Sequence, residues 1–370
     1  MTNFSLNDKH FNDLLIKDVE IPYGSFNYPC RLKVNPDAQY LSVQLHGAVP
    51  NRREAALPIF SRWNYGKILG AHVLSICDPT IYLSEDLSVG WYLGSREENA
   101  IQGIVAIASR CAEILGVGPE RVIFSGSSGG GFAALQAAAL VDNGKAIAIN
   151  AQTNLMRYPE RFLQSYAELA ANYSSIEEAR ETIGNRWNVI DSLNVSCNSG
   201  RNPQIVIVQN RNEWHYSQHY LPFAEAFGLN PQEEQSISGS FMSILYDGSP
   251  DHGPEPMEVV KRINNEAVPF LLNLDSASKS RSGCYVNITV KSGQIHAQIE
   301  IDGPYQFACY LYKDNVIAKK NFNYSQESKF VFDLIGDGNY RCEGFVKDQS
   351  GEIFSAISNM VHVDFDKCES

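Results

Sequence analysis

The stretch at residues 121–140 constrains the fold more than any other part of the chain. It begins with β-branched and aromatic residues at 122–124, which are typical of a strand. Glycines then occupy positions 126 and 129–131, and an alanine-rich segment follows, which favours a helix. The sequence therefore predicts a strand, a tight glycine turn and a helix in direct succession.

Within this turn, Gly126, Ser128 and Gly130 match the G-x-S-x-G pattern of a nucleophile elbow, in which a strained turn presents a serine at the start of a helix. Glycine suits the flanking positions because it leaves room beside the turn. Ser128 is therefore the candidate nucleophile, and the backbone N–H of Gly129 is the first candidate donor to an oxyanion. The alternative is a glycine turn of purely structural use.

A second oxyanion donor is predicted where an earlier strand ends. Residues 41–45 alternate as a strand and run into His46, Gly47 and Ala48. In an α/β-hydrolase arrangement, the loop after the third strand supplies this donor. We assign it to Gly47 or Ala48. The alternative is that His46 and Gly47 only turn the chain.

Two later strand ends supply a candidate acid and a candidate base. The strand predicted at 204–208 runs into a loop whose only carboxylate is Glu213, and the strand predicted at 238–246 opens into a Gly/Pro-rich loop that contains His252. In this fold the acid and the histidine follow the serine in that order. We therefore predict that Glu213 orients His252, which takes the proton from Ser128. The alternative for His252 is a solvent-exposed loop residue.

Neighbouring residues offer alternatives to these roles. Asp247 and Asp251 are fallback acids, but they lie so close in sequence to His252 that shaping the loop is the simpler role. His215 and His219 are four residues apart and would share one face of a helix, as metal ligands often do. Because the only other ligand nearby in sequence is the acid itself, we predict no metal. Hydrolysis at such a serine site also requires no cofactor.

The order of the predicted elements divides the chain into two domains. Residues 1–274 are predicted to form an α/β-hydrolase-like catalytic domain, a mostly parallel sheet flanked by helices, with a polar helical insertion at about 155–190. A serine-rich linker is predicted at 275–283. Short alternating strands in residues 284–370 predict an all-β immunoglobulin-like or fibronectin-like sandwich.

The cysteines favour reduced thiols over a metal site or a disulfide framework. All eight are scattered, and no pair has the C-x-x-C spacing of zinc ligands. Cys309 and Cys342 would fall on facing strands of the predicted sandwich, so a bond between them remains open. For a cytoplasmic protein we expect both to be free.

The charge balance limits the partners. The 370 residues carry a net charge of −12, which disfavours nucleic acids and anionic membranes. No stretch approaches the ~18 apolar residues that a membrane span requires, and residues 1–20 lack the apolar core of a secretory signal. We expect no nucleic-acid partner, no membrane span and a cytoplasmic location.

These motifs together resemble a known family. The stretch at 126–135, the loop at 209–215 with its glutamate and the loop at 251–254 look like the Ser-Glu-His α/β-hydrolase-fold proteins of bacterial accessory secretion and surface-polysaccharide systems. The resemblance covers about residues 40–272. It implies that Ser128, Glu213 and His252 form a catalytic triad.

The resemblance also implies an activity. Members of this family are similar to carbohydrate O-acetyltransferases or esterases, so we expect a carbohydrate or glycoconjugate substrate and an acyl-enzyme. Transfer as against hydrolysis, the acetyl donor and any protein partners in glycan assembly or export stay open. The alternatives are a non-catalytic scaffold or glycan-binding protein, or a peptidase or lipase of the same fold. A lipase is disfavoured because the insertion is polar.

Overall fold

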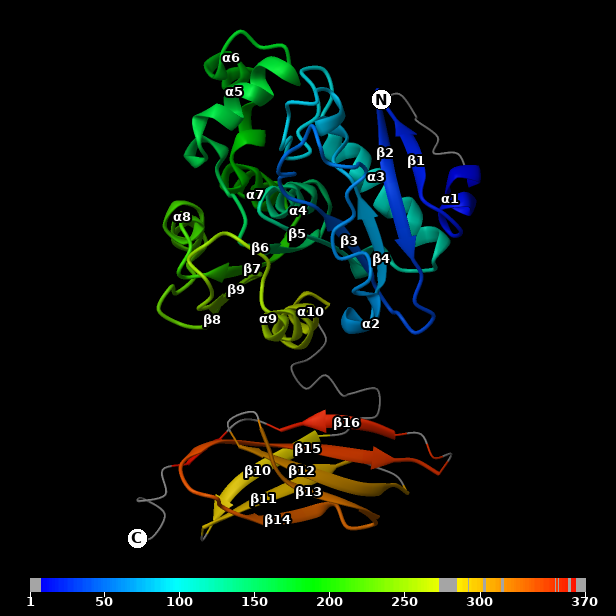
Figure 1. Cartoon of the computed structure of the whole chain (residues 1–370), viewed down its shortest axis with the longest axis vertical. Coiled ribbons are helices and arrows are strands. Elements are labelled where there is room, and N and C mark those ends of the chain that lie inside the picture. Colours follow the sequence, from blue (N-terminus) through cyan, green and yellow to red (C-terminus); the bar gives the residue numbers. More distant parts are fainter. Residues whose placement is uncertain are drawn as a thin grey trace. The chain divides into compact units, whose positions relative to one another are not determined.

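The computed structural model describes residues 8–272, 285–291, 293–301, 304–313, 316–349, 351, 353–358 and 361–363. They belong to two compact units, which divide the chain into Met1–Leu274 and Asp275–Ser370 (Figure 1). The linker predicted at 275–283 lies outside the described residues.

The larger unit is built around one sheet, which has nine strands within the described residues. Their order is β1-β2-β4-β3-β5-β6-β7-β9-β8. The bounds are β1 (Val19–Tyr23), β2 (Phe26–Lys33), β3 (Leu41–Leu45), β4 (His72–Ile76), β5 (Val122–Ser127), β6 (Lys145–Ile149), β7 (Gln204–Asn210), β8 (Gln235–Ser238) and β9 (Phe241–Tyr246). Strands β4, β3, β5, β6, β7 and β9 pair in parallel, whereas β1, β2 and β8 pair antiparallel at the edges. The predicted mostly parallel sheet is confirmed.

One strand prediction needs correction. The segment at 238–246 is not a single strand but the turn and second strand of a hairpin formed by β8 and β9. Gly239, with a φ of 57°, makes this turn possible because glycine adopts the left-handed region without steric cost. Strand β8 of this hairpin is the antiparallel edge of the sheet and pairs with β9, the strand that precedes His252.

Helices cover both faces of the sheet (Figure 1). One buried cluster includes residues of α1 (Asp8–Leu14), α3 (Ala100–Ile114), α4 (Gly129–Leu140), α7 (Val189–Asn198) and α8 (Leu221–Phe227). A second includes residues of α2 (Gly66–Leu69), α9 (Met257–Arg262) and α10 (Val268–Leu271). The small side chains of α4 let it pack closely on β5 and β6, so the helix behind Ser128 is buried along most of its length. In the described part of the chain, no helix has the length and apolar character that crossing a bilayer requires.

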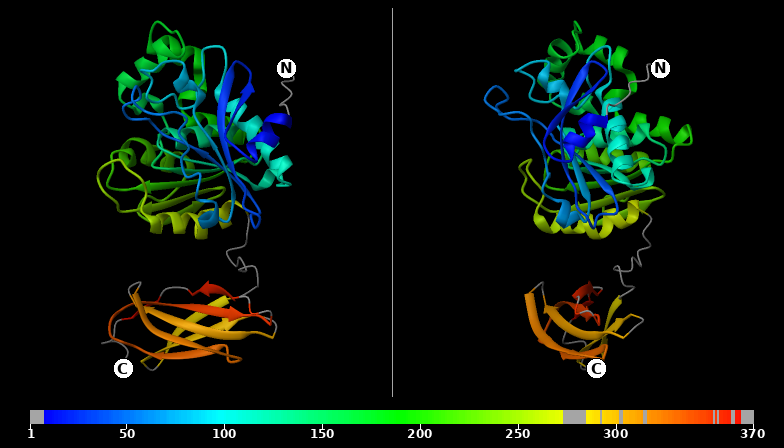
Figure 2. Two further views of the ribbon diagram at one scale, coloured as in Figure 1. Left: turned by 45° about the vertical axis from the view of Figure 1, so that its right-hand side comes forward. Right: turned by 90° about the vertical axis from the view of Figure 1, so that its right-hand side faces the viewer.

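The segment between β6 and α7 forms the helices of the predicted insertion, grouped at one end of the unit (Figure 2). They are η3 (Leu155–Arg157), α5 (Glu160–Leu169), α6 (Ile176–Ile183) and η4 (Gly184–Trp187). Tyr166, Tyr173 and Trp187 are buried, and the Trp187 Nε1–H donates to the Ala179 carbonyl at 3.2 Å. These three rings therefore pack inside the insertion and hold its helices together. The remaining short helical segments of this unit are η1 (Pro79–Tyr82), η2 (Pro119–Arg121), η5 (Tyr216–Tyr220) and η6 (Ile263–Ala267).

The smaller unit consists of two antiparallel sheets, as predicted. One contains β10 (Tyr285–Lys291), β11 (Gln294–Glu300) and β14 (Lys329–Asp333). The other contains β12 (Gln306–Lys313), β13 (Val316–Ser325), β15 (Gly338–Lys347), β16 (Ile353–Ile357) and β17 (Val361–Val363). Apolar side chains of both sheets share one core, in which a Cβ added at Gly344 of β15 would meet Ile299 of β11 at 2.7 Å.

Tyr340 gives this sandwich an immunoglobulin-like detail. Its hydroxyl donates to the Gly336 carbonyl at 2.6 Å, and it stands two residues before Cys342, as in the tyrosine corner of such folds. Cys342 and Cys309 are buried free thiols, as expected. The hydrogen bond that the Cys309 thiol donates to Cys342, together with burial, raises the pKa of Cys309 well above its usual range.

Candidate active site

Ser128 lies at the apex of the turn between β5 and α4, with a φ of 54° and a ψ of −122°. Such a backbone conformation costs a non-glycine residue on the order of 1–3 kcal/mol. The glycines on both sides allow it. A Cβ at Gly130 would lie 2.2 Å from the Leu45 carbonyl oxygen, and one at Gly126 would lie 2.4 Å from the Gly130 carbonyl. The turn therefore has the geometry of a nucleophile elbow.

The loop after β3 lies against this elbow. A Cβ at Gly47 would lie 3.2 Å from the Ser128 Cβ and 3.7 Å from the Gly129 backbone nitrogen. The two predicted oxyanion donors, Gly47 and Gly129, are thus neighbours in space, and Ala48 follows as an exposed residue. Their role in holding an oxyanion remains a prediction.

His46 fixes that loop. Its Nε2 accepts from the Asp78 backbone N–H at 2.9 Å, so the proton is on Nδ1, which donates to the Gly47 carbonyl at 2.7 Å. Burial lowers the pKa of His46 to about 4, which keeps the ring neutral. The Asp78 side chain in turn accepts from the backbone of Thr80 and Tyr92. The side chains of His46 and Asp78 therefore have a structural role, because both hold nearby backbone in place by hydrogen bonds.

Glu213 and His252, the predicted acid and base, lie together. The Oε2 of Glu213 is 2.7 Å from the Nδ1 of His252, and its Oε1 accepts from the Gln209 side chain at 2.9 Å. Burial raises the pKa of Glu213, but the close contacts with His215 and His252 outweigh it and bring that pKa to about 2. Glu213 is therefore an ionised carboxylate that holds His252 by one ring nitrogen.

Asn210, at the end of β7, holds the loops of Glu213 and His252 together. Its side chain donates to the Ser249 carbonyl at 2.6 Å and accepts from the Gly248 backbone N–H at 2.8 Å. The Asn212 side chain adds a hydrogen bond of 2.8 Å to the Gly248 carbonyl. Sequence reasoning did not single out Asn210, because its role depends on two loops that are far apart in sequence.

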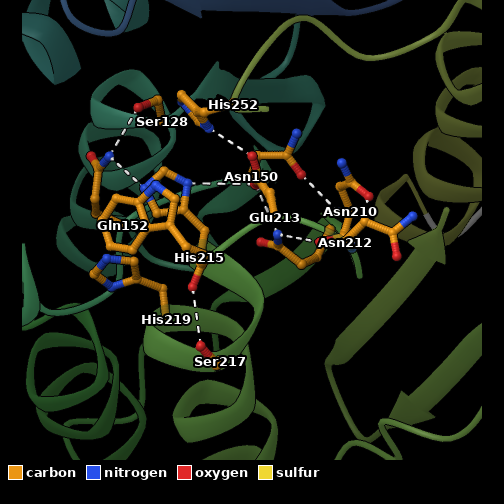
Figure 3. Close-up of polar contacts among 12 residues, drawn as sticks. Ser128, Asn150, Gln152, Asn210, Asn212, Glu213, His215, Ser217, His219 and His252 are labelled. Carbon is orange, nitrogen blue, oxygen red and sulfur yellow. Dashed lines mark hydrogen bonds and ion pairs between the residues drawn. The ribbon is translucent and has the colours of Figure 1, made fainter. Parts of the chain in front are cut away.

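Ser128 is hydrogen-bonded to Gln152, a residue for which the sequence predicted no functional role. The Oγ of Ser128 accepts a hydrogen bond of 2.9 Å from the Nε2 of Gln152, which follows β6 (Figure 3). The same Nε2 lies 3.2 Å from the Nε2 of His215. Among the described residues, no hydrogen bond joins Ser128 to His252. The two are linked through their neighbours, since the His215 and His252 rings lie 4.4 Å apart between centroids.

Glu213, His215 and His252 form a cluster of residue types that can bind a metal ion. One ligand atom of each lies within 4.8 Å of the others. Tetrahedral ligands at about 2.0–2.1 Å from zinc are separated by about 3.3 Å. The 2.7 Å between Glu213 and His252 is shorter and is a hydrogen-bond distance. His219, the other histidine considered as a ligand, instead accepts from the Thr153 backbone N–H at 3.3 Å.

Aromatic side chains border the site. Trp214 is 40% exposed, and its ring lies 4.1 Å from that of His215 and 5.7 Å from that of Tyr158 between centroids. Tyr158, a half-buried residue of the insertion, also packs edge-on against Trp91. Phe162 of the insertion is also half-buried and lies 5.3 Å from Tyr158 between ring centroids, whereas Tyr158 contacts the rings of Trp214 and His215.

No protein-family model and no curated protein sequence matches the chain. Solved structures do match in fold. The Glycosylation Associate Protein (Gap123) complex from Streptococcus agalactiae is 16% identical with a TM-score of 0.50 over 72% of this chain and 48% of that chain. The present chain thus spans about half of that structure.

Two smaller proteins have similar folds. The capsule O-acetyltransferase of Neisseria meningitidis serogroup A is 15% identical with a TM-score of 0.49, over 67% of this chain and 93% of that chain. The serine hydrolase FphF of Staphylococcus aureus is 14% identical with a TM-score of 0.45, over 70% and 98%. The strand order of the larger unit, together with the match at a TM-score of 0.50, confirms the predicted α/β-hydrolase-like fold.

Proposed function

We propose that the protein carries out serine-dependent acyl-ester chemistry on carbohydrate, as an O-acetyl esterase or O-acetyltransferase of a surface glycan. One observation carries this proposal: Glu213 holds the Nδ1 of His252 at 2.7 Å, beside an elbow that presents Ser128. The three residues follow in the order of hydrolase triads, each after a separate strand of the sheet.

The first half of the reaction forms an acyl-enzyme. The Nε2 of His252 takes the hydroxyl proton of Ser128 while the Oγ forms a bond to the ester carbonyl carbon. The carbonyl oxygen becomes an oxyanion and is bound by the N–H groups of Gly129 and of Gly47 or Ala48. The C–O bond to the sugar then breaks, and His252 returns the proton to the leaving sugar oxygen.

In the second half, His252 takes a proton from the attacking water or hydroxyl, whose oxygen forms a bond to the acyl carbon. The bond between that carbon and the Ser128 Oγ then breaks, and His252 returns the proton to the Oγ. Water as the attacking group gives hydrolysis, for which no cofactor is required. A sugar hydroxyl gives transfer, in which case an acetyl donor acylates the serine. Glu213 stays ionised throughout, because its pKa is lowered to about 2, and it stabilises the imidazolium.

Sequence motifs, an exposed aromatic ring and one structure of similar fold support carbohydrate as the substrate. The resemblance in the elbow and the two loops points to sugar esters, and the partly exposed Trp214 offers an aromatic face to the apolar side of a sugar ring. One structure of similar fold is described as a glycosylation-associated complex, which supports both a glycan substrate and protein partners. The free buried cysteines support the predicted cytoplasmic location.

The proposal is tested by comparing wild type with Ser128→Ala on acetylated and free oligosaccharides, with and without an acetyl donor, followed by mass. We expect loss of acetyl groups by hydrolysis, or their gain by transfer, in wild type and neither in the variant. Equal turnover by Ser128→Ala would refute serine chemistry. Glycan or partner binding without turnover in both proteins would favour the non-catalytic scaffold, and turnover only of amides or long-chain esters would favour the peptidase or lipase.

A further inference from the structure

We infer that Gln152 is a further catalytic residue, whose side-chain amide donates a hydrogen bond to the reacting Oγ of Ser128, and that His215 positions this amide. The inference rests on the proposed function, because it assumes that Ser128 is the nucleophile. It adds to that function a side-chain donor and a second histidine, neither of which belongs to the triad.

The orientation of the Gln152 amide follows from its neighbours. The indole Nε1–H of Trp91 can only donate, and it lies 3.3 Å from the Oε1 of Gln152. The Nε2 of Gln152 therefore carries its two N–H groups toward Ser128 and His215. Gln152 is only 1% exposed, so water does not compete for these groups.

The same hydrogen bonds determine which ring nitrogen of His215 carries the proton. Since Gln152 donates to its Nε2, that nitrogen accepts, and the ring proton is on Nδ1. This Nδ1 faces the Oε1 of Glu213 at 3.4 Å, a long contact that orients the ring by charge more than by a full hydrogen bond. Burial lowers the pKa of His215 and so favours the neutral ring over the imidazolium. Glu213 thus holds two histidines, His252 directly and His215 on its other oxygen.

Gln152 acts on the oxygen that changes charge. In the resting enzyme the Ser128 oxygen accepts from Gln152, which leaves the hydroxyl proton free to pass to His252. As that proton leaves, the oxygen gains negative charge, and a hydrogen bond to a charged acceptor is stronger than one to a neutral hydroxyl. The same oxygen becomes negative again when it leaves the acyl carbon, so Gln152 assists both halves of the reaction.

His215 positions Gln152 without touching the substrate. With Trp91 on the amide oxygen and His215 on one amide N–H, the second N–H has one direction left, toward Ser128. A side chain without an acceptor at the His215 Nε2 position would let the amide turn. His215 is therefore a positioning residue.

The test uses the rate at which a fluorophosphonate labels the full-length protein, because this rate reports the reactivity of Ser128 without any sugar substrate. We expect Gln152→Met to slow labelling by about 10- to 100-fold, as the loss of a hydrogen bond to a charged group implies. The control is Gln44→Met, which removes an equally buried glutamine that bonds to Ser42 in β3. It should label at the wild-type rate. Labelling of Gln152→Met within twofold of wild type overturns the inference.

A second pair of variants tests His215. His215→Phe keeps a planar ring without an acceptor, whereas the side-chain carbonyl of His215→Gln can accept from Gln152. We expect His215→Phe to lower kcat for an acetyl ester by about tenfold with KM unchanged, as the loss of part of one hydrogen bond implies, and His215→Gln to recover most of it. Equal losses in both variants overturn the positioning role. This pair decides the inference if Gln152→Met does not fold.

The outcomes separate the two proposals. If wild type is not labelled, or Ser128→Ala is labelled as fast as wild type, the proposed function fails. If labelling requires Ser128 but is unaffected by Gln152→Met and His215→Phe, the proposed function stands and this inference fails.

Discussion

Arg62 and Glu255 form a two-point ion pair, with distances of 2.9 Å and 2.7 Å, between the loop after β3 and the loop that carries His252. Their side chains are only 12% and 3% exposed. The pair therefore connects the segment between β3 and α2, which begins with the predicted oxyanion donors, to the loop that carries His252. The two residues are 193 positions apart in sequence.

Breaking this pair should lower the stability of the larger unit. We expect Arg62→Met to lower the free energy of unfolding by about 3–5 kcal/mol, because it leaves Glu255 buried and unpaired. Urea unfolding followed by tryptophan fluorescence measures this in the larger unit, since all four tryptophans lie before residue 275. Arg53→Met, which breaks the exposed Arg53–Asp86 pair, is the control and should change little. Similar midpoints for both variants would contradict the role of the Arg62 pair.

The elbow glycines should not tolerate a side chain. At Gly130 a Cβ would meet backbone oxygens of Leu45 and His46 at 2.2 Å and 2.7 Å. We expect Gly130→Ala to destabilise the protein by about 3 kcal/mol or more, at the upper end of overpacking costs, since backbone cannot move aside easily. Gly253→Ala is the stability control, because a Cβ there meets nothing within 4 Å. A wild-type unfolding midpoint for Gly130→Ala would show that the turn is looser than described.

These residues also mark the limit of prediction from sequence. The elbow, Glu213 and His252 could be found because each stands next to a strand whose pattern is local, and the fold fixes their order along the chain. Arg62, Asn210 and Gln152 could not, because a single polar residue in a loop carries no signal of the distant loop it bonds to.

The remaining errors have physical causes of the same kind. The polar insertion was expected to be a solvated pair of helices or to carry aromatic residues on a sugar-binding face, but Tyr166, Tyr173 and Trp187 are buried inside it. The spacing of His215 and His219 left a metal site as an alternative that was not preferred, and it gave no sign that the His215 ring lies between Gln152 and Glu213. Periodicity shows which face a residue occupies and not which partner it meets.

Glu213 should make stability depend on acid pH. Its pKa in the folded protein is about 2, below the ordinary value of 4.5, so its ionised form stabilises the fold fully above pH 4.5, and this contribution is lost as the pH falls toward 2. Glu213→Gln lacks this titration. The difference in unfolding free energy between wild type and Glu213→Gln should narrow from pH 5 to pH 2. A difference that stays constant across this range would contradict the ionised, paired state.

Metal removal should not affect the reaction. The 2.7 Å contact between Glu213 and His252 is a hydrogen bond, and a cation would have to separate the two groups. We expect dialysis against a chelator to leave the labelling rate unchanged, and excess zinc to slow labelling by competing for His252. Loss of labelling with the chelator, restored by zinc, would instead make the cluster a metal site.

The most direct test of the central claim is the site of covalent labelling, read by mass spectrometry after treatment with a fluorophosphonate. We predict one adduct, on the peptide that contains Ser128, none in Ser128→Ala, and labelling slowed on the order of 10⁴-fold in His252→Ala. An adduct on another residue, or wild-type labelling of His252→Ala, would contradict the triad of Ser128, Glu213 and His252.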